Sequence, residues 1–493
     1  MLFNSSKYII FFPIVFLVYF ICPKKIRYIW LLAASFFFYM QWNYTYILLL
    51  IYTIAITYIC GLLVDYHKKC GMEGKAKGCL IVSIVLNLST VAWFKYTNFF
   101  INNINGLLHH CNANVSFSSL DILLPVGISF FTFQAISYTI DVYRGTICAE
   151  RNVLKYALFV SFFPQLVAGP IERSPNLLVQ IKQSTNYSLK NVKEGLIIIL
   201  FGLFQKIVIA DNIALIIDPV FSEYNVYRAE DIVVAILLFG IQIYCDFGGY
   251  SNIAIGSAKI LGYNLMENFR APYLAQSVGD FWQRWHISLT AWFRDYLYIP
   301  LGGNRRGRIR EYINKMVVFL LSGLWHGANW SYVVWGGVNG LYQIVEEGFK
   351  NTFIKLNKIL KLDRNCFDCK IIHGIITYLL IDFTWLFFRA DSVSDAFKMI
   401  RYILENWKFK RLLTNNVFNI FENTLNVVVL GISIVLLLFV DILKEKGYEF
   451  SKYILKSNLL FKWGILLFML LFIIVFGVYG GDNGQTQFIY FQF

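Results

Sequence analysis

Charged residues are scarce in this chain. They make up 15% of its 493 residues, whereas hydrophobic residues make up 57% and aromatic residues 18%. Soluble proteins carry charge on about a quarter of their residues. The scarcity therefore excludes an ordinary soluble fold and predicts an all-α polytopic membrane protein, with a single membrane domain over residues 1–493. The net charge of +14 does not indicate nucleic acid, because Lys and Arg cluster between apolar runs, as membrane topology requires.

Other absences narrow the class. The nine cysteines are scattered and predict no disulfide framework. Cys366 and Cys369 have no second pair and no histidine at ligand spacing, so no metal site and no permanently bound cofactor is predicted. The first apolar run, Tyr8 to Cys22, lacks a small-residue cleavage site and is interpreted as a span rather than a removable signal. No repeat of fixed period is present, and no inverted repeat of the kind that transporters show.

The charge between apolar runs orients the chain. Basic residues follow the first and third runs, whereas the loops after the second and fourth runs contain no Lys or Arg. Because cytoplasmic loops carry the excess of Lys and Arg, this alternation places the N-terminus outside and the basic loops in the cytosol. Continued to the end of the chain, the count predicts about 11–13 transmembrane helices and an extracytoplasmic tail at 480–493.

Several runs carry features that a plain span would not. Val153–Ala168 is interrupted by Pro164, which predicts a re-entrant element, since irregular backbone at membrane depth must be buried in protein or line water. Asp231–Leu261 contains Asp246 and Asn252, which are expected to face the bundle interior. Two further expectations are a hairpin of spans over Tyr312–Glu346 that turns near Asn329, and an amphipathic helix over Ala390–Phe421 on the outer surface.

Two of the six histidines directly follow a tryptophan. His286 lies where apolar residues recur at helical spacing, which predicts one helix from the Ser277-x-x-Asp280 start signal to Pro300. The members of this stripe are Phe281, Trp285, Leu289, Trp292 and Tyr296. His286 is expected to polarise a donor carbonyl or to orient a second ring. A purely structural role is an equal alternative.

His326 follows Lys315 by eleven residues, which places it roughly 16 Å beyond the last fixed charge. That is about the middle of a hydrocarbon layer ~30 Å thick. An ionisable ring at that depth is costly unless it lines a polar cavity, and small or polar residues surround this one. Because imidazole titrates near neutral pH, His326 is predicted to take a proton from an attacking hydroxyl. The alternative is a structural histidine bonded to a backbone carbonyl.

Four ordered motifs resemble the membrane-bound O-acyltransferase (MBOAT) family. They are FFPQLVAGPIER (Phe162–Arg173), YCDFGGYSNIAIG (Tyr244–Gly256), NFRAPYLAQSVGDFWQRWHISLTAWFRDYLYIPLGGNR (Asn268–Arg305) and LSGLWHGANW (Leu321–Trp330). The resemblance is to the bacterial polysaccharide branch, which includes alginate and peptidoglycan O-acetyltransferase membrane components and the D-alanyl transfer protein of teichoic acids. The family's invariant histidine falls on His326 and its second histidine on His286. Asn252 departs from the pattern, because an Asp is expected there in many relatives.

The resemblance implies a ring of helices around a thin centre in a bacterial cell membrane, with re-entrant elements and a central tunnel. The tunnel would join a cytosolic acyl donor, acetyl-CoA or an acyl carrier protein, to an acceptor outside. Asp246, Asn252 and Asn329 would line it. Arg305, Arg306 and Arg308 would face the phosphate-bearing donor, and ordinary positive-inside anchoring is the alternative explanation for these arginines.

The tail ends in FIYFQF, with Tyr490 among aromatic residues. Fourteen residues follow Tyr479 and reach up to ~45 Å when extended, which is enough to fold back to His326. The ending resembles the F-x-Y-x-x-F motif of the small partner peptide in teichoic-acid D-alanylation. This suggests that Tyr490 relays the acyl group to an extracytoplasmic partner acyltransferase that acts on a glycan. An aromatic interface anchor is the alternative.

The resulting prediction is an O-acyltransferase that moves an acetyl or other small acyl group from a cytosolic thioester towards a cell-surface or exported polysaccharide. D-alanyl transfer to teichoic acid from a carrier protein is the alternative within the family. A polytopic transporter, or a non-catalytic scaffold for a glycan synthase, is the alternative from another class.

Overall fold

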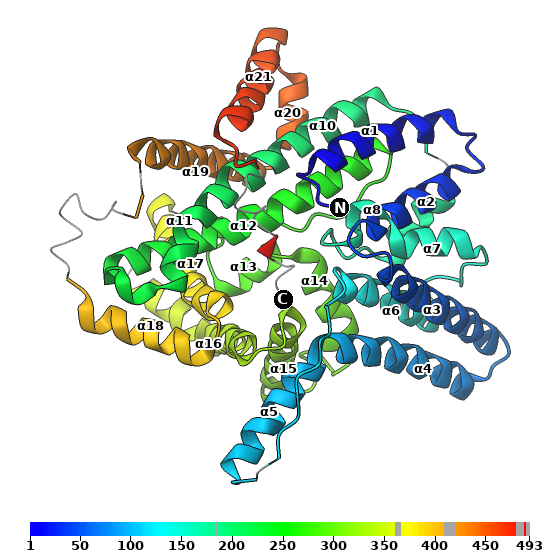
Figure 1. Ribbon diagram of the computed structural model, residues 1–493, viewed down its shortest axis with the longest axis horizontal. Helices are drawn as coiled ribbons and strands as arrows, with labels where there is room; N and C mark the ends of the chain where they lie inside the picture. Colours follow the sequence, from blue (N-terminus) through cyan, green and yellow to red (C-terminus); the bar gives the residue numbers. More distant parts are fainter. Residues whose placement is uncertain are drawn as a thin grey trace. The chain divides into compact units, whose positions relative to one another are not determined.

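The computed structural model of the protein (Figure 1) describes residues 1–113, 115–183, 185–359, 366–408, 420–421, 423–479 and 488–489. No strand occurs among these residues, so the predicted all-α class is confirmed. The chain divides into two compact units. The first contains Met1–Ile199 and Ile253–Met266, and the second contains Leu200–Asn252 and Glu267–Phe493. That the two units form one membrane domain stays a prediction.

Seven helical stretches in the described part of the chain are long and apolar enough to cross a membrane. They are Tyr46–Lys69, Glu73–His110, Leu189–Ser222, Ala229–Ile260, Phe367–Arg389, Thr424–Glu445 and Leu459–Phe476. Two shorter apolar helices, Ser6–Ile21 and Arg27–Met40, match the first two predicted crossings. The polytopic class is therefore confirmed, while the count of about 11–13 spans stays a prediction.

The first unit begins with α1 (Ser6–Ile21), α2 (Arg27–Met40), α3 (Tyr46–Lys69) and α4 (Glu73–Val91), which continues through the π-helical turn η1 (Ala92–Tyr96) into α5 (Thr97–His110). It goes on with α6 (Ile128–Arg144), α7 (Val153–Ser161), α8 (Phe163–Leu166), η2 (Ser174–Leu178), α9 (Val179–Lys182) and most of α10 (Leu189–Leu203). Helix α6 begins directly after Gly127, which has a positive φ of 77°.

The break predicted within Val153–Ala168 is confirmed. Helix α7 ends at Ser161 and α8 begins at Phe163, with Pro164 in its first turn, where a missing N–H costs no helical bond. The interruption leaves backbone carbonyls without helical partners, and the side chains of Gln134 and Gln165 both donate to the Phe159 carbonyl, at 2.6 and 3.0 Å. Buried irregular backbone is thus satisfied by side-chain amides.

The second unit begins with the π-helical turn η3 (Phe204–Ala210), α11 (Asp211–Ser222), η4 (Tyr224–Val226) and α12 (Ala229–Ile260) up to Asn252. After Glu267 come η5 (Pro272–Leu274), α13 (Val278–Arg284), α14 (Ile287–Phe293), η6 (Arg294–Tyr298), α15 (Arg308–His326) and α16 (Trp330–Ile359). The remaining helices are α17 (Phe367–Arg389), α18 (Val393–Asn406), α19 (Thr424–Glu445), α20 (Phe450–Lys456) and α21 (Leu459–Phe476). The amphipathic helix expected over Ala390–Phe421 ends at Asn406, and residues 409–419 lie outside the described residues.

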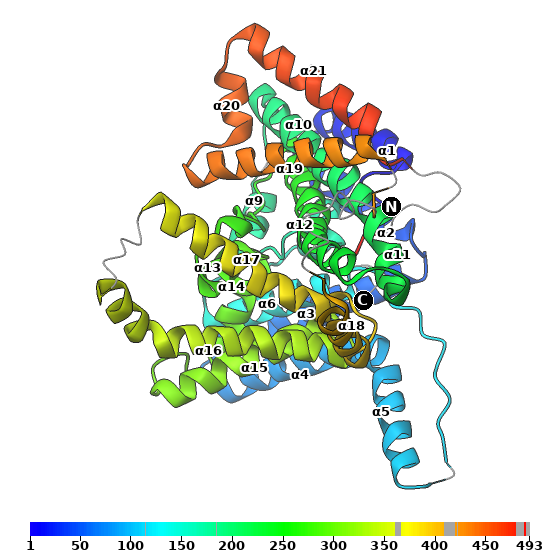
Figure 2. The same ribbon diagram turned by 90° about the vertical axis from the view of Figure 1, so that its left-hand side faces the viewer.

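The predicted hairpin is confirmed as a helix pair, whereas its crossing of the membrane stays a prediction. Helices α15 and α16 pack side by side (Figure 2) and turn at 327–329. Glycines allow this close approach: a Cβ on Gly323 would overlap the backbone carbonyl of Tyr332, and one on Gly336 would overlap that of Phe319. Because the backbones themselves are in contact, the end of α15 is fixed against α16.

Candidate active site

The helix predicted from Ser277 to Pro300 is broken at His286, and the prediction of one continuous helix is wrong. Ser277 caps α13 by accepting from the Asp280 N–H, as its start signal indicated. Helix α13 then ends at Arg284, Trp285 is extended, and His286 adopts the left-handed conformation with a φ of 42° and a ψ of 53°. A non-glycine residue in that region is held there by its surroundings and often lies at a functional site.

Residues Asn268–Arg270 supply the hydrogen bonds that stabilise the helix break at His286. The Arg270 N–H donates to the Arg284 carbonyl and the Ile287 N–H donates to the Asn268 carbonyl, both at 2.9 Å. The Ser288 hydroxyl donates to the Asn268 side-chain oxygen at 2.6 Å. These bonds replace those that the interrupted helix loses. Asn268 was not predicted as a site residue, and only its presence in a resembling motif pointed to it.

His286 is buried among rings. Its imidazole lies 4.7 Å from the ring of Phe247, 6.0 Å from Trp325 and 6.5 Å from His326, measured between ring centroids. Burial lowers the pKa of His286 from 6.5 to about 3, because a charged imidazolium is poorly solvated there. The ring is therefore neutral at physiological pH, and a neutral imidazole offers one donor and one acceptor.

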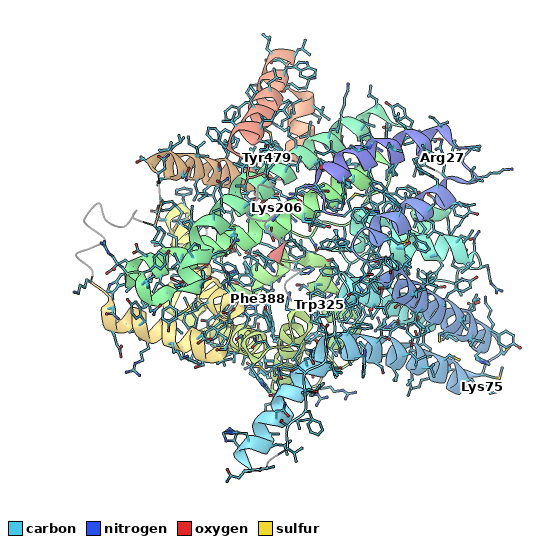
Figure 3. The ribbon with its side chains drawn as sticks, viewed as in Figure 1. Arg27, Lys75, Lys206, Trp325, Phe388 and Tyr479 are labelled. Atoms are coloured by element: carbon cyan, nitrogen blue, oxygen red, sulfur yellow. The ribbon has the colours of Figure 1, made fainter. Side chains whose placement is uncertain are left out.

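His326 is the last residue of α15 and is 5% exposed. Its ring is held edge-on by Trp325, Trp335 and Phe388, with centroids at 5.0, 5.1 and 5.4 Å. Figure 3 labels Trp325 and Phe388, which come from α15 and α17. The structure thus brings the two predicted histidines together in one aromatic cluster, at the end of a helix that its glycine contacts hold in place.

Asp246 is buried, as expected for a residue that faces the interior, and it has a partner that was not predicted. The ammonium group of Lys206, labelled in Figure 3, lies 2.5 Å from Asp246 Oδ1 and 2.7 Å from Asp211 Oδ1. All three side chains are at most 5% exposed. A lysine within the apolar run Gly195–Ile217 was the available signal, because a buried charge requires a partner.

The two predicted tunnel amides have different surroundings. Asn252 donates to Gln205 Oε1 at 2.6 Å. Asn329 accepts from the Ser331 N–H at 2.9 Å and donates to the Asp391 carbonyl at 2.8 Å. The first bond caps the start of α16 and the second ties that cap to Asp391, so both bonds of Asn329 support a structural role.

Tyr490 lies outside the described residues, but the two residues before it are described. Phe488 is 1% exposed, and its ring lies 4.8 Å from that of Tyr250 and 5.8 Å from that of Phe247. The Ile489 N–H donates to Asp246 Oδ2 at 2.9 Å. Phe247 therefore contacts both the C-terminal segment and His286.

The three predicted donor-binding arginines, Arg305, Arg306 and Arg308, are exposed. They lie on or directly after a turn in which Gly302, Gly303 and Gly307 have positive φ. Asn314 fixes this turn by donating to the Gly303 carbonyl at 2.9 Å. Within the described residues, no group of three His, Cys, Asp or Glu side chains is placed to hold a metal ion.

Comparison with known proteins gives the family. The model of the MBOAT, membrane-bound O-acyltransferase family, matches residues 109–360. The chain is 36% identical over 416 residues to the probable alginate O-acetylase AlgI of Pseudomonas syringae, covering 84% of this chain and 77% of that protein. It is 35% identical over 433 residues to the peptidoglycan O-acetyltransferase of Helicobacter pylori, covering 81% and 79%.

A more distant relative is the teichoic acid D-alanyltransferase of Bacillus subtilis. It is 28% identical over 251 residues, which cover 48% of this chain and 61% of that protein. The matches to alginate and peptidoglycan enzymes cover most of both chains, and the resembling motifs contain the two clustered histidines. The chain therefore belongs to the membrane-bound O-acyltransferase family and is a multi-pass membrane O-acyltransferase.

Proposed function

We propose that this enzyme moves an acetyl or other small acyl group from a cytosolic thioester, across a bacterial cell membrane, for O-acylation of an exported polysaccharide. The relatives that cover most of the chain are named for acetylation of alginate and of peptidoglycan. The observation that carries the proposal is the pair of buried histidines, His286 and His326. Phe247, which contacts His286, also contacts Phe488 near the C-terminus.

In the proposed reaction His326 acts as the general base and Tyr490 as the acyl acceptor. The Tyr490 oxygen attacks the thioester carbonyl while His326 takes the phenol proton. Collapse of the tetrahedral adduct breaks the C–S bond, and the thiolate leaves with the proton from His326. Neutral His286 donates a hydrogen bond to the carbonyl oxygen as negative charge develops there.

The second transfer needs a partner enzyme outside the membrane. A glycan hydroxyl attacks the Tyr490 ester, and the phenol is released for another cycle. Since the reference pKa of a phenol is about 10, far below that of a sugar hydroxyl, the ester is activated for this step. The tail of 480–493 and the N-terminus are extracytoplasmic in this proposal.

The donor is bound on the cytosolic side by Arg305, Arg306 and Arg308. Their exposure and the fixed glycine turn suit recognition of phosphate, either of acetyl-CoA or of the phosphopantetheine arm on an acidic carrier protein. Asp246 and Asn252 lie along the path between the donor and Tyr490 in this proposal. D-alanyl transfer is the second possibility, and mass analysis of the acylated residue separates the two.

Intact mass analysis of the C-terminal peptide after turnover tests the relay. In the wild type we expect an adduct of one acyl group on Tyr490, with a mass that identifies the acyl group. The adduct should be absent from His326→Ala and from Tyr490→Phe, which keeps the aromatic ring. A wild-type peptide that stays unmodified during turnover would contradict the relay, and full transfer by His326→Ala would contradict the proposed base.

A further inference from the structure

The C-terminal segment is bonded at two points to the same short part of the second unit. The Val478 N–H donates to the Ile207 carbonyl at 2.9 Å. Eleven residues later, the Ile489 N–H donates to Asp246 Oδ2 at 2.9 Å. The other oxygen of Asp246 is paired with Lys206, which directly precedes Ile207. Val478 is therefore attached directly at Ile207, and Ile489 is attached through Asp246, which is paired with the preceding residue, Lys206.

The π-helical turn η3 makes these attachments possible. A π-helical turn bonds each N–H one residue further back than an α-helix does, which frees carbonyl groups for other partners, and such turns often occur at functional sites. Here the Ile207 carbonyl accepts from Val478, and Asn212, just after the turn, donates to the Phe476 carbonyl at 3.0 Å. The exit of α21 is thus tied to η3 and to the residues that follow it.

Helix α12 comes close enough to η3 for Lys206 to reach Asp246 because of Gly249. A Cβ at Gly249 would lie 2.7 Å from the Gly202 carbonyl and 2.9 Å from the Lys206 nitrogen, closer than a real Cβ approaches. Only glycine permits this separation. Gly249 of the Tyr244–Gly256 motif therefore has a definite role, which is to let the Asp246 carboxylate approach a buried lysine.

The two oxygens of Asp246 have separate partners. Oδ1 is paired with the ammonium group of Lys206, and Lys206 is also paired with Asp211. The ion pair at Oδ1 would be enough by itself to hold η3 against α12. Oδ2 accepts from the Ile489 N–H, which is 243 residues away along the chain. A hydrogen bond from a buried amide to a charged carboxylate is stronger than a neutral one.

The neighbouring side chains complete a site for the described C-terminal residues Phe488 and Ile489. Phe488 is buried between Phe247 and Tyr250, which lie one and four residues after Asp246 on α12. A ring contact and a charge-assisted backbone bond at adjacent residues fix both the position and the direction of the chain. Ile489 itself is 8% exposed.

We propose that η3 and the Asp246–Tyr250 face of α12 form an intramolecular docking site for the C-terminal segment, in which Asp246 is a positioning residue held by Lys206. The docking site fixes the chain immediately before Tyr490. Its consequence for catalysis rests on the proposed relay, whereas the docking itself does not.

The sharpest test removes the donor and leaves the ion pairs intact. Proline has no N–H, so Ile489→Pro deletes the bond to Asp246. Leu459→Pro is the matched control, because Leu459 is the exposed first residue of α21, where proline is tolerated. In purified full-length protein, we expect carboxypeptidase to trim the C-terminus of Ile489→Pro about 10-fold faster than that of the wild type or the control. Formation of the Tyr490 adduct should fall about 10- to 100-fold.

Asp246→Asn tests the acceptor, with exposed Asp121→Asn as its control. Asp246→Asn removes the charge that accepts from Ile489 and is paired with Lys206, so in the double variant Ile489→Pro should add little to its effect on trimming. A thermal melt identifies variants that fail to fold. If Asp246→Asn fails to fold, the trimming rate of Ile489→Pro is the test of the docking site.

The outcomes separate docking from relay. Trimming of folded Ile489→Pro at the wild-type rate would overturn the docking site, whatever happens to the adduct. Faster acyl transfer in Ile489→Pro would leave the docking site standing and overturn the relay, because the docked segment would then inhibit transfer. Faster trimming without any adduct on wild-type Tyr490 would leave the docking site standing and remove the relay.

Discussion

Gly323 offers a direct test of how the α15–α16 hairpin positions His326. It lies on α15 three residues before His326, at the point where a Cβ would overlap the backbone carbonyl of Tyr332. A flexible side chain could move aside, but a backbone carbonyl within α16 cannot move alone. Gly323→Ala should therefore push the two helices apart and carry His326 with α15.

The magnitude follows from the geometry. Relief of the overlap requires a separation on the order of 1 Å, and a displacement of about 1 Å at a catalytic group costs about 10²-fold in rate. Overpacking of a tightly packed contact costs about 1–3 kcal/mol of stability. We expect kcat to fall about 100-fold, with only a moderate loss of thermal stability and with KM for the donor little changed.

The matched control is Gly337→Ala on the facing helix. A Cβ there would lie 3.6 Å from Leu320 Cδ2, which is ordinary van der Waals contact. This variant should keep its activity and gain up to about 1 kcal/mol, because alanine is the better helix former. The assay measures acyl transfer from a labelled donor in purified protein, beside a thermal melt in detergent.

Two results would refute the reasoning. Wild-type kcat in folded Gly323→Ala would show that His326 does not depend on the helix contact. Equal losses in Gly323→Ala and Gly337→Ala would show that any added methyl group in the hairpin is harmful, irrespective of its distance from the neighbouring backbone.

Three further predictions concern other parts of the site. Asn268→Ala removes the two side-chain bonds to Ser288 that help to hold the break at His286; it should cost about 1–3 kcal/mol of stability and lower transfer, as measured by thermal melts and turnover. Burial lowers the pKa of His286 to about 3, so below pH 6.5 the unfolded chain binds a proton at this residue and the native chain does not. The free energy of unfolding of the wild type should therefore fall by about 2 kcal/mol between neutral pH and pH 5. His286→Gln should lose this part of the pH dependence. Replacement of Arg305, Arg306 and Arg308 together by Gln should raise KM for the donor by about 10-fold and reduce its salt dependence, with kcat within about 2-fold of the wild type.

The arginine prediction has a control, and both it and the pH prediction have a contrary outcome. Lys398→Gln with Arg401→Gln removes exposed charge from α18 and should leave KM unchanged, since neither residue lies near the arginine turn in the chain. An unchanged KM in the arginine variant would leave only a topological role for those residues. A pH dependence of stability that is identical in His286→Gln and the wild type would contradict the buried neutral imidazole.

Much of the architecture could be predicted from local properties of the chain. Apolar runs and the charge between them identified the spans, because the cost of burying charge in hydrocarbon depends on composition alone. The break just before Pro164 and the turn at 327–329 were indicated by residues at or beside those positions. Counting residues from Lys315 placed His326 at the far end of one helix, as α15 shows, whereas its depth in the membrane stays a prediction.

The break at His286 could not be predicted in this way. The apolar stripe from Phe281 to Tyr296 has helical spacing, and nothing within it favours an interruption. The helix breaks because Asn268 and its neighbours supply the hydrogen bonds that a continuous helix would have made itself. Such competition between local and tertiary bonds is decided only when the chain has folded.

The sequence by itself determined that this protein is an all-helical, polytopic membrane acyltransferase, and it identified both histidines. Only the tertiary structure decided how other residues of the site are partnered: the ion pairs of Lys206, the capping role of Asn329 and the place of Phe488 against Phe247. The physical reason is that a buried charge, amide or ring is stabilised by whichever group meets it in space. In this chain those groups come from residues up to 243 positions apart.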